Sequence, residues 1–175
     1  MDIFTAGHGN RHISELLQLL ESAGIETLLD VRRYPSSRRN PQFNGLILKN
    51  SLRSRGIDYL WEGENLGGHG KLRATNSRLA LKSDNMRAYA DHMHTETFRE
   101  SVHRALHQAQ IAPTVLMCAE LYPVGCLRSL ISDYLSLNCA KFQHLVNPVT
   151  SFSHQTHPDA LLTNNIVIYD RSTKM

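Results

Sequence analysis

Two cysteines, a glutamate and an arginine are concentrated in the segment 114–135, which reads TVLMCAELYPVGCLRSLISDYL. Cys118 and Glu120 follow a short apolar run, and Cys126 and Arg128 stand at the beginning of an amphipathic helix. A helix N-terminus lowers the pKa of a thiol and attracts anions. A Cys126 thiolate could therefore attack an electrophile while Arg128 holds its phosphate or carboxylate group, with Glu120 as acid or base.

The spacing of the cysteines limits this chemistry. The phosphatase spacing C-x5-R is absent after Cys118 and after Cys126, which argues against phosphoryl transfer. C-x7-C is too long for a zinc knuckle, and three cysteines without a CxxC pair do not indicate a disulfide framework. Cys118 and Cys139 fit small buried side chains better. A metal site built from Cys118, Cys126 and a histidine is the alternative.

A histidine and an asparagine follow the first apolar run, 3–6. His8 and Asn10 lie in a Gly-His-Gly-Asn turn that allows a ligand to approach the backbone closely. The carboxyl ends of parallel strands meet at one sheet edge, so His8 and Asn10 could face the cysteines. We expect His8 as an acid or base and Asn10 as a ligand contact. The alternative is a turn histidine with a structural hydrogen bond only.

An acid and two arginines stand at the end of the second apolar run, 27–31, and directly after it. Asp30, Arg32 and Arg33 are poor core residues, because an unpaired buried charge is costly. They should face a ligand, with Asp30 in acid–base work and the arginines on a phosphate. The structural alternative is a buried ion pair of Asp30 with Arg32 or Arg128 that only orders the loops.

Further basic and glycine-rich stretches predict an anion-binding face. The long loop 34–44 has two prolines and no periodicity, and it carries Arg38 and Arg39. Gly67 and Gly68 belong to a glycine-rich loop that could cradle an anion, although the P-loop spacing is absent. A second basic patch contains Lys71, Arg73 and Arg78. The net charge of +3 and the pI of 8.9 permit a nucleic-acid partner.

Hydrophobic periodicity predicts alternating strands and helices. Apolar runs indicate strands over 3–6, 27–31, 57–61, 114–119 and 142–146, with a short edge strand over 166–169. Between them, apolar stripes indicate helices, two of which are capped by Asn44 and Thr95. The pattern predicts one α/β domain over 1–175, a three-layer sandwich with a mostly parallel sheet of about five strands. Residues 147–175 are expected to form a less regular extension.

Other features exclude some classes of protein. No apolar run reaches the roughly 18 residues of a membrane span, and the first residues are not a signal peptide, so we expect a cytoplasmic protein without a membrane partner. Four histidines could suggest a metal site, but the absence of HExxH favours solvated side chains at His92, His94, His103 and His107. The sequence specifies neither a cofactor nor an oligomeric state.

Several motifs together resemble the DUF488 family. They are TAGHGNR at 5–11, LLDVRRYPSSRRNPQFN at 28–44, LGG at 66–68, YADHM at 89–93, LMCAE at 116–120 and CLRSLISDYL at 126–135. The resemblance extends over roughly residues 3–147 and implies a family of uncharacterised role. The family usually reads C-H-R where this chain has Cys126-Leu127-Arg128. If that histidine is an acid or base, this chain has lost it or replaces it with another, such as His8 or His144. A role confined to positioning would be less affected.

Three functions are consistent with these residues. The first is an enzyme that binds a nucleotide or nucleic acid through its arginines and uses Asp30, Glu120 and Cys126 in chemistry. The second is a non-catalytic nucleic-acid-binding module in which the cysteines only pack. The third is the cysteine–histidine metal site.

Overall fold

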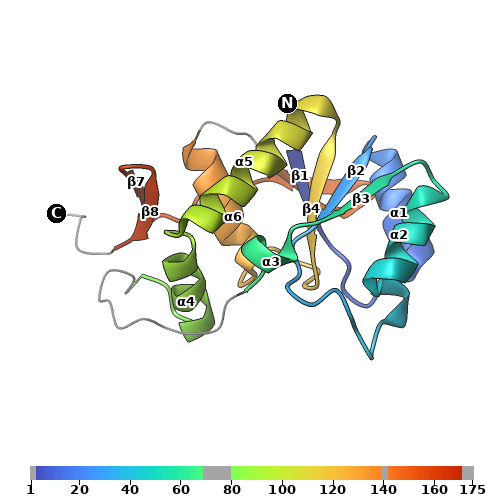
Figure 1. Ribbon diagram of the computed structural model, residues 1–175, viewed down its shortest axis with the longest axis horizontal. Helices are drawn as coiled ribbons and strands as arrows, with labels where there is room; N and C mark the ends of the chain where they lie inside the picture. Colours follow the sequence, from blue (N-terminus) through green and yellow to red (C-terminus); the bar gives the residue numbers. More distant parts are fainter. Residues whose placement is uncertain (1–2, 69–79, 139–141, 171–175) are drawn as a thin grey trace.

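The computed structural model describes residues 3–68, 80–138 and 142–170 and has a six-stranded sheet at its centre. The strands are β1 (Ile3–Gly7), β2 (Thr27–Asp30), β3 (Asp58–Trp61), β4 (Thr114–Cys118), β5 (Phe142–Asn147) and β6 (Thr150–Ser153). Their order is β3-β2-β4-β1-β5-β6, with the first five parallel and β6 antiparallel to β5. The predicted mostly parallel sheet is confirmed, and each of its five predicted strands is present (Figure 1).

Helices cover both faces of the sheet and make three layers. The first face carries α1 (Ile13–Ser22) and α2 (Gly45–Arg53), and the other carries α4 (Asp84–His92), α5 (Glu96–Ile111) and α6 (Leu127–Leu137). Side chains alternate along each strand, so neighbouring leucines of β2 enter opposite layers. Leu28 packs in the cluster of α1 and α2, whereas Leu29 packs in the cluster of α5 and α6.

Of the two predicted helix caps, the side chain of Thr95 caps its helix and the side chain of Asn44 does not. The hydroxyl of Thr95 accepts a hydrogen bond from the backbone N–H of Phe98 at 3.3 Å, as expected for the cap of α5. Asn44 stands at the cap position of α2, but its side chain accepts from the backbone N–H of Ser37 at 2.6 Å instead. It therefore fixes the preceding arginine loop rather than the helix end.

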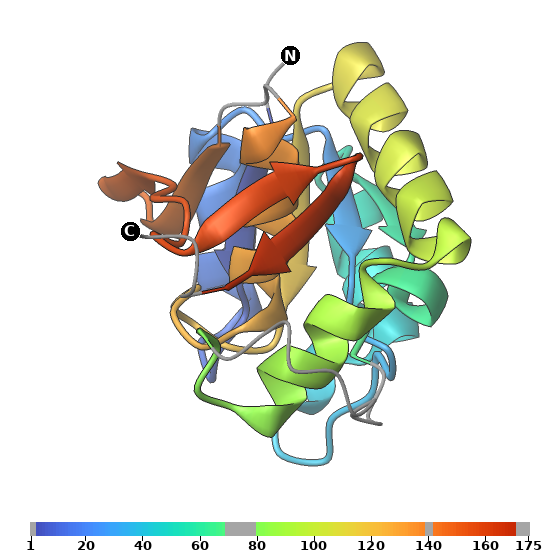
Figure 2. The ribbon, with the colours of Figure 1, turned by 90° about the vertical axis from the view of Figure 1, so that its left-hand side faces the viewer.

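The region after Pro148 is more regular than the sequence predicts. β6 is followed by a hairpin of β7 (Ala160–Thr163) and β8 (Ile166–Tyr169), which form a separate two-stranded sheet. Asn164 and Asn165 have φ of 52° and 60°, the left-handed conformation that a two-residue hairpin turn needs. The hairpin packs on α6 (Figure 2). Residues 150–153, 160–163 and 166–169 are strands, and the edge strand predicted over 166–169 is present and pairs with β7.

Two loops also contain short helices that periodicity did not indicate. α3 (Gly63–Leu66) occupies the start of the predicted glycine-rich loop, and a 3-10 turn (Pro41–Phe43) lies in the arginine loop. Lys71, Arg73, Arg78 and Cys139 lie outside the described residues. Within the described ranges, no helix is both long and apolar enough to cross a membrane.

Candidate thiol site

The register of the sheet brings three loops together at its carboxyl edge. β4 lies between β1 and β2, with Cys118 opposite Gly7 and Met117 opposite Asp30. Gly7 is packed so closely that an added Cβ would lie 1.7 Å from the carbonyl oxygen of Glu120. The loop after β4 can therefore fold back over the end of β1 only because residue 7 has no side chain.

Cys118 and Cys126 face each other at this edge. Their sulfur atoms are 2.7 Å apart, and both thiols are free. One carboxylate oxygen of Glu120, Oε2, lies 3.1 Å from the sulfur of Cys118 and 3.2 Å from that of Cys126. Both cysteines are buried, whereas Glu120 is exposed. The result is a buried thiol pair with a carboxylate that reaches it from the surface.

Arg128 is the buried counter-charge of the thiol pair. Its Nε donates to the sulfur of Cys118 at 2.8 Å, and its other two nitrogens donate to the hydroxyl of Thr5 at 3.3 Å and the carbonyl of Glu120 at 2.6 Å. Only 1% of Arg128 is exposed. Burial acts to lower its pKa, but the charges of Cys118 and Cys126 outweigh burial and raise it. These contacts use each guanidinium nitrogen, so Arg128 holds the thiols in place.

The two thiols differ in acidity. The pKa of Cys126 is lowered, first by the hydrogen bond from the Cys118 thiol and then by the charge of Arg128. Burial raises the pKa of Cys118, and its contact with Cys126 raises it further. Burial acts to raise the pKa of Glu120, but hydrogen bonds from both thiols lower it overall. Cys126 is therefore the more acidic of the two thiols.

A pocket of about 350 Å³ opens beside Cys126. Its described lining consists of Gly68, Asn85, Met86, Tyr89, Glu120, Gly125, Cys126 and Leu127. Cys126 is also the N-cap of α6, and its sulfur accepts from the backbone N–H of Arg128 at 3.5 Å. The pocket thus gives a small molecule access to the more acidic thiol, while Cys118 is behind it.

Asp30, Arg32 and His8 form a second buried network. The carboxylate of Asp30 accepts from Nε of Arg32 at 2.9 Å and from its NH2 at 2.6 Å, and Tyr59 donates its hydroxyl at 2.9 Å. Arg32 also donates to the carbonyl of Phe43 and to Nε2 of His8, at 2.8 and 3.2 Å. The charge of Asp30 is balanced by Arg32, as the structural alternative for these residues expects.

His8 is neutral in this network. Its Nδ1 donates to the carbonyl of Gly9 at 2.7 Å, its Nε2 accepts from Arg32, and its ring stacks on Phe43 with centroids 4.4 Å apart. Burial lowers its pKa. The geometry ties His8 to the loop after β2, and Asn10 is exposed in the adjacent turn.

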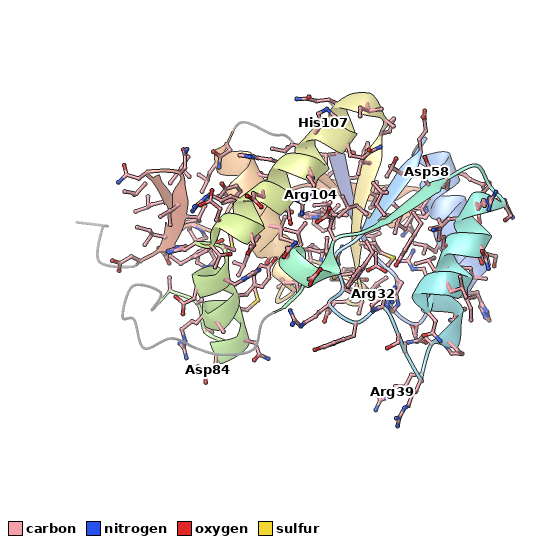
Figure 3. All side chains as sticks on the ribbon, in the orientation of Figure 1. Arg32, Arg39, Asp58, Asp84, Arg104 and His107 are labelled. Carbon is pink, nitrogen blue, oxygen red and sulfur yellow. The ribbon has the colours of Figure 1, made fainter. Side chains whose placement is uncertain are left out.

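The remaining predicted ligand contacts do not lie together in one site. Arg38 and Arg39 are exposed, and Arg39 projects at the tip of its loop, away from Arg32 (Figure 3). Arg33 donates to the hydroxyl of Tyr34 at 3.3 Å. Gly67 packs against the backbone of Arg33, where a Cβ would be 2.6 Å from the Arg33 Cα. Gly68 lines the thiol pocket.

The thiol site could also hold a metal ion. Ligand atoms of Cys118, Glu120 and Cys126 all lie within 4.8 Å of one another, and two thiolates with a carboxylate suit zinc. The third ligand is a glutamate, not the histidine that the sequence suggested. His103 and His107 are exposed on α5, as predicted, and His94 contacts the carbonyl of Val167 at 3.1 Å.

A buried polar chain connects the thiol site to the C-terminal strands, and the sequence did not reveal it. Arg128 donates to Thr5, Thr5 lies 2.6 Å from Nδ1 of His144, His144 lies 2.9 Å from His154, and His154 lies 2.9 Å from Asp133. Burial lowers the pKa of His144 to about 4. If each group donates a hydrogen bond to the next, from Arg128 through to Asp133, every polar group in the chain has a partner and both histidine rings can be neutral. The feature of the sequence that could have indicated this chain is Asp133, an aspartate among the apolar residues of α6.

The comparisons agree with the motifs. Searches of curated proteins and of solved structures returned no match for the chain. The family model described as "Domain of unknown function DUF488" matches residues 12–135, which is more than half of the chain and includes the thiols, Arg32 and Arg128. The chain belongs to the DUF488 family.

Proposed function

We propose that this protein is a thiol-dependent enzyme in which Cys126 is the nucleophile. The observation that carries the proposal is the position of Cys126 at the N-terminus of α6 and on the wall of a 350 Å³ pocket. A nucleophilic cysteine needs a lowered pKa, access for its substrate and a nearby cation, and Cys126 has all three.

Neighbouring side chains have separate tasks in this proposal. Arg128 and the Cys118 thiol stabilise the Cys126 thiolate. The Cys118 thiol contacts the Cys126 sulfur directly, and the Arg128 guanidinium donates to the sulfur of Cys118. Glu120 is the acid–base residue, because its carboxylate touches both sulfurs and is itself exposed to solvent. Asp30 and His8 keep the loops at the sheet edge in place through Arg32.

Selective alkylation tests the nucleophile. The protein with Cys139→Ser is treated with limiting iodoacetamide at pH 7, and the modified residue is located by peptide mass spectrometry. We expect Cys126 to be alkylated before Cys118 and the reaction to disappear in Cys126→Ser. Preferential alkylation of Cys118, or no alkylation of the folded protein, contradicts the proposal.

A phosphate-bearing ligand is the second candidate, favoured by the exposed arginines of the loop after β2. Arg38 and Arg39 are exposed, so they are the arginines we assign to a nucleotide or nucleic-acid contact. Arg32 and Arg128 would then act indirectly by holding the loops. Such binding is dominated by phosphate contacts and weakens steeply with salt.

Binding at low and moderate salt separates this candidate from the first. Nucleotides and a single-stranded oligonucleotide are added in a thermal-shift assay, and a true ligand raises the melting temperature with its concentration. Binding that is lost in Arg38→Gln/Arg39→Gln but kept in Cys126→Ser supports a binding module. Absence of any shift at low salt contradicts the phosphate ligand.

A further inference from the structure

We propose that Cys118 is the resolving thiol of Cys126. The two cysteines cycle between a dithiol and a disulfide, and in doing so they reduce a small neutral or cationic disulfide substrate to two thiols. The inference rests on the proposed nucleophilic role of Cys126 and adds a partner thiol and a substrate class. It makes the protein a thiol–disulfide oxidoreductase without a CxxC motif.

The distance between the sulfurs is the first support. At 2.7 Å, the two sulfurs need to approach by less than about 1 Å to reach the length of a disulfide bond. Cys118 is the last residue of β4 and Cys126 is the cap of α6, so the loop between them, and not a change of sheet or helix, can absorb this movement.

The asymmetry of the pair is the second support. Both cysteines belong to the apolar cluster between the sheet and α6, but Cys126 lines the pocket and Cys118 does not. A substrate therefore reaches Cys126 first. Cys118 can attack only a sulfur that is already attached to Cys126, which is the requirement for a resolving cysteine.

The reaction balances with two thiols and one substrate disulfide. The Cys126 thiolate attacks one sulfur of R–S–S–R, the substrate S–S bond breaks, and RS⁻ leaves and takes a proton from solvent. Cys118 then passes its proton to Glu120, which lies 3.1 Å away, and attacks the Cys126 sulfur. A second RS⁻ leaves as the Cys118–Cys126 bond forms, and it takes the proton back from Glu120 to become RSH. The substrate gains two electrons and the protein dithiol loses two.

Arg128 favours return to the dithiol. In the dithiol its buried guanidinium donates to the sulfur of Cys118 and can stabilise a thiolate on either cysteine, whereas the disulfide has no thiolate for it to stabilise. A buried arginine that loses its anionic partner destabilises the oxidised state. A small external thiol should therefore reduce the disulfide readily and complete a catalytic cycle.

The charge of the pocket selects the substrate class. Glu120 is the charged residue of its described lining, beside the apolar side chains of Met86, Tyr89 and Leu127 and the amide of Asn85. A carboxylate at the entrance repels anionic disulfides. A neutral probe such as bis(2-hydroxyethyl) disulfide or a cationic one such as cystamine should therefore react faster than dithiodiglycolate.

Stoichiometry tests the resolving role. Reduced protein with Cys139→Ser and no external thiol is mixed with excess bis(2-hydroxyethyl) disulfide, and released thiol and intact mass are measured. We expect two thiols released per protein and a product lighter by two hydrogens. Cys118→Ser should release one thiol and keep one half of the probe on Cys126, and circular dichroism verifies that this variant is folded.

Other outcomes separate the two proposals. If Cys126 is alkylated by iodoacetamide but does not react with any disulfide probe, the resolving role is wrong and the nucleophile stands. If the wild-type protein retains the adduct as Cys118→Ser does, Cys118 does not resolve it. If Cys126 resists both reagents, the nucleophile itself is wrong. Stoichiometric zinc that protects both thiols in freshly purified protein overturns the redox cycle in favour of a metal site.

Discussion

The Nε of Arg128 lies 2.8 Å from the sulfur of Cys118, and both side chains are buried. An arginine in the core normally pairs with a carboxylate, but here its Nε points at a thiol and the nearby Glu120 carboxylate touches the two sulfurs instead. The guanidinium charge of Arg128, in the first turn of α6, is thereby directed at the thiol pair. This relationship makes the acidity of Cys126 depend on a residue that does not line its pocket.

Replacing Arg128 should raise the pH at which Cys126 reacts. In the wild-type protein the rate of alkylation should have its midpoint below the ordinary thiol pKa of about 8.5. Arg128→Lys keeps the charge but loses the fork that contacts Cys118, Thr5 and Glu120, so the midpoint should move upward. Iodoacetamide rates from pH 5 to 10 measure it. An unchanged midpoint in folded Arg128→Lys shows that the guanidinium does not control the thiol.

Removing the charge of Asp30 should destabilise the fold strongly. Asp30→Asn leaves the Arg32 guanidinium buried without its anion, which costs about 3–5 kcal/mol of the free energy of unfolding. Tyr59→Phe is the matched control, since it removes one hydrogen bond to the same carboxylate and should cost only about 0.5–1.5 kcal/mol. Urea unfolding monitored by circular dichroism measures both. Equal losses in the two variants contradict a buried ion pair.

Protonation of His144 should weaken the protein in mild acid. Its pKa is about 4 in the folded chain and about 6.5 in the unfolded chain, so the unfolded chain binds a proton first as the pH falls. The free energy of unfolding should therefore decrease from pH 6.5 to 4, by on the order of 3 kcal/mol from this residue.

Denaturant unfolding at several pH values tests this dependence. His144→Gln should be less stable at pH 7 but have a shallower slope between pH 6.5 and 4. His107→Gln, at an exposed position on α5, should keep the wild-type slope. Parallel curves for the wild-type protein and His144→Gln contradict the assignment.

A side chain at position 7 should disrupt the thiol site by displacing the loop after β4. In Gly7→Ala the new Cβ would meet the Glu120 carbonyl at 1.7 Å and NH2 of Arg128 at 2.9 Å, so the loop after β4 must move. We expect a loss of stability of about 1–3 kcal/mol or more and slower alkylation of Cys126. Gly68→Ala is the control for stability, because its Cβ would meet only Leu127 at 3.7 Å. Normal alkylation in Gly7→Ala contradicts the packing described above.

A histidine at position 127 should create a stronger metal site. Leu127 lines the pocket together with Cys126 and Glu120, so Leu127→His adds an imidazole to two thiols and a carboxylate. Cobalt titration followed by thiolate-to-metal absorption should show tighter binding than in Leu127→Asn. Equal affinities indicate that residue 127 does not reach the ion.

The sequence predicts the parallel sheet well and the C-terminal strands poorly, for a physical reason. Strands buried on both faces are continuous apolar runs, such as 27–30 and 114–118, and these stand out. β6 is a polar edge strand with all four residues exposed, so neither apolar runs nor alternation reveal it. Its position depends on pairing with β5, which is a tertiary contact.

The candidate site was predictable in location but not in its contacts. Cys118, Glu120 and Cys126 are close in sequence and share a strand end and a helix start, so their proximity follows from local structure. The contact of Thr5 with His144 joins residues 139 positions apart, and no local pattern encodes it. The arginines were expected to bind a ligand because buried charge is costly, yet Arg32 and Arg128 meet that cost with partners from their own chain.

The carboxylate of Asp133 has three partners that come from beyond the family match, which ends at residue 135. They are the His154 ring, the backbone N–H of His157 and the hydroxyl of Tyr169. A polypeptide shortened to the matched stretch would leave that carboxylate without these partners and would lose β1, β5 and β6 from the sheet. We therefore expect the matched stretch of this protein to require residues outside the match in order to fold.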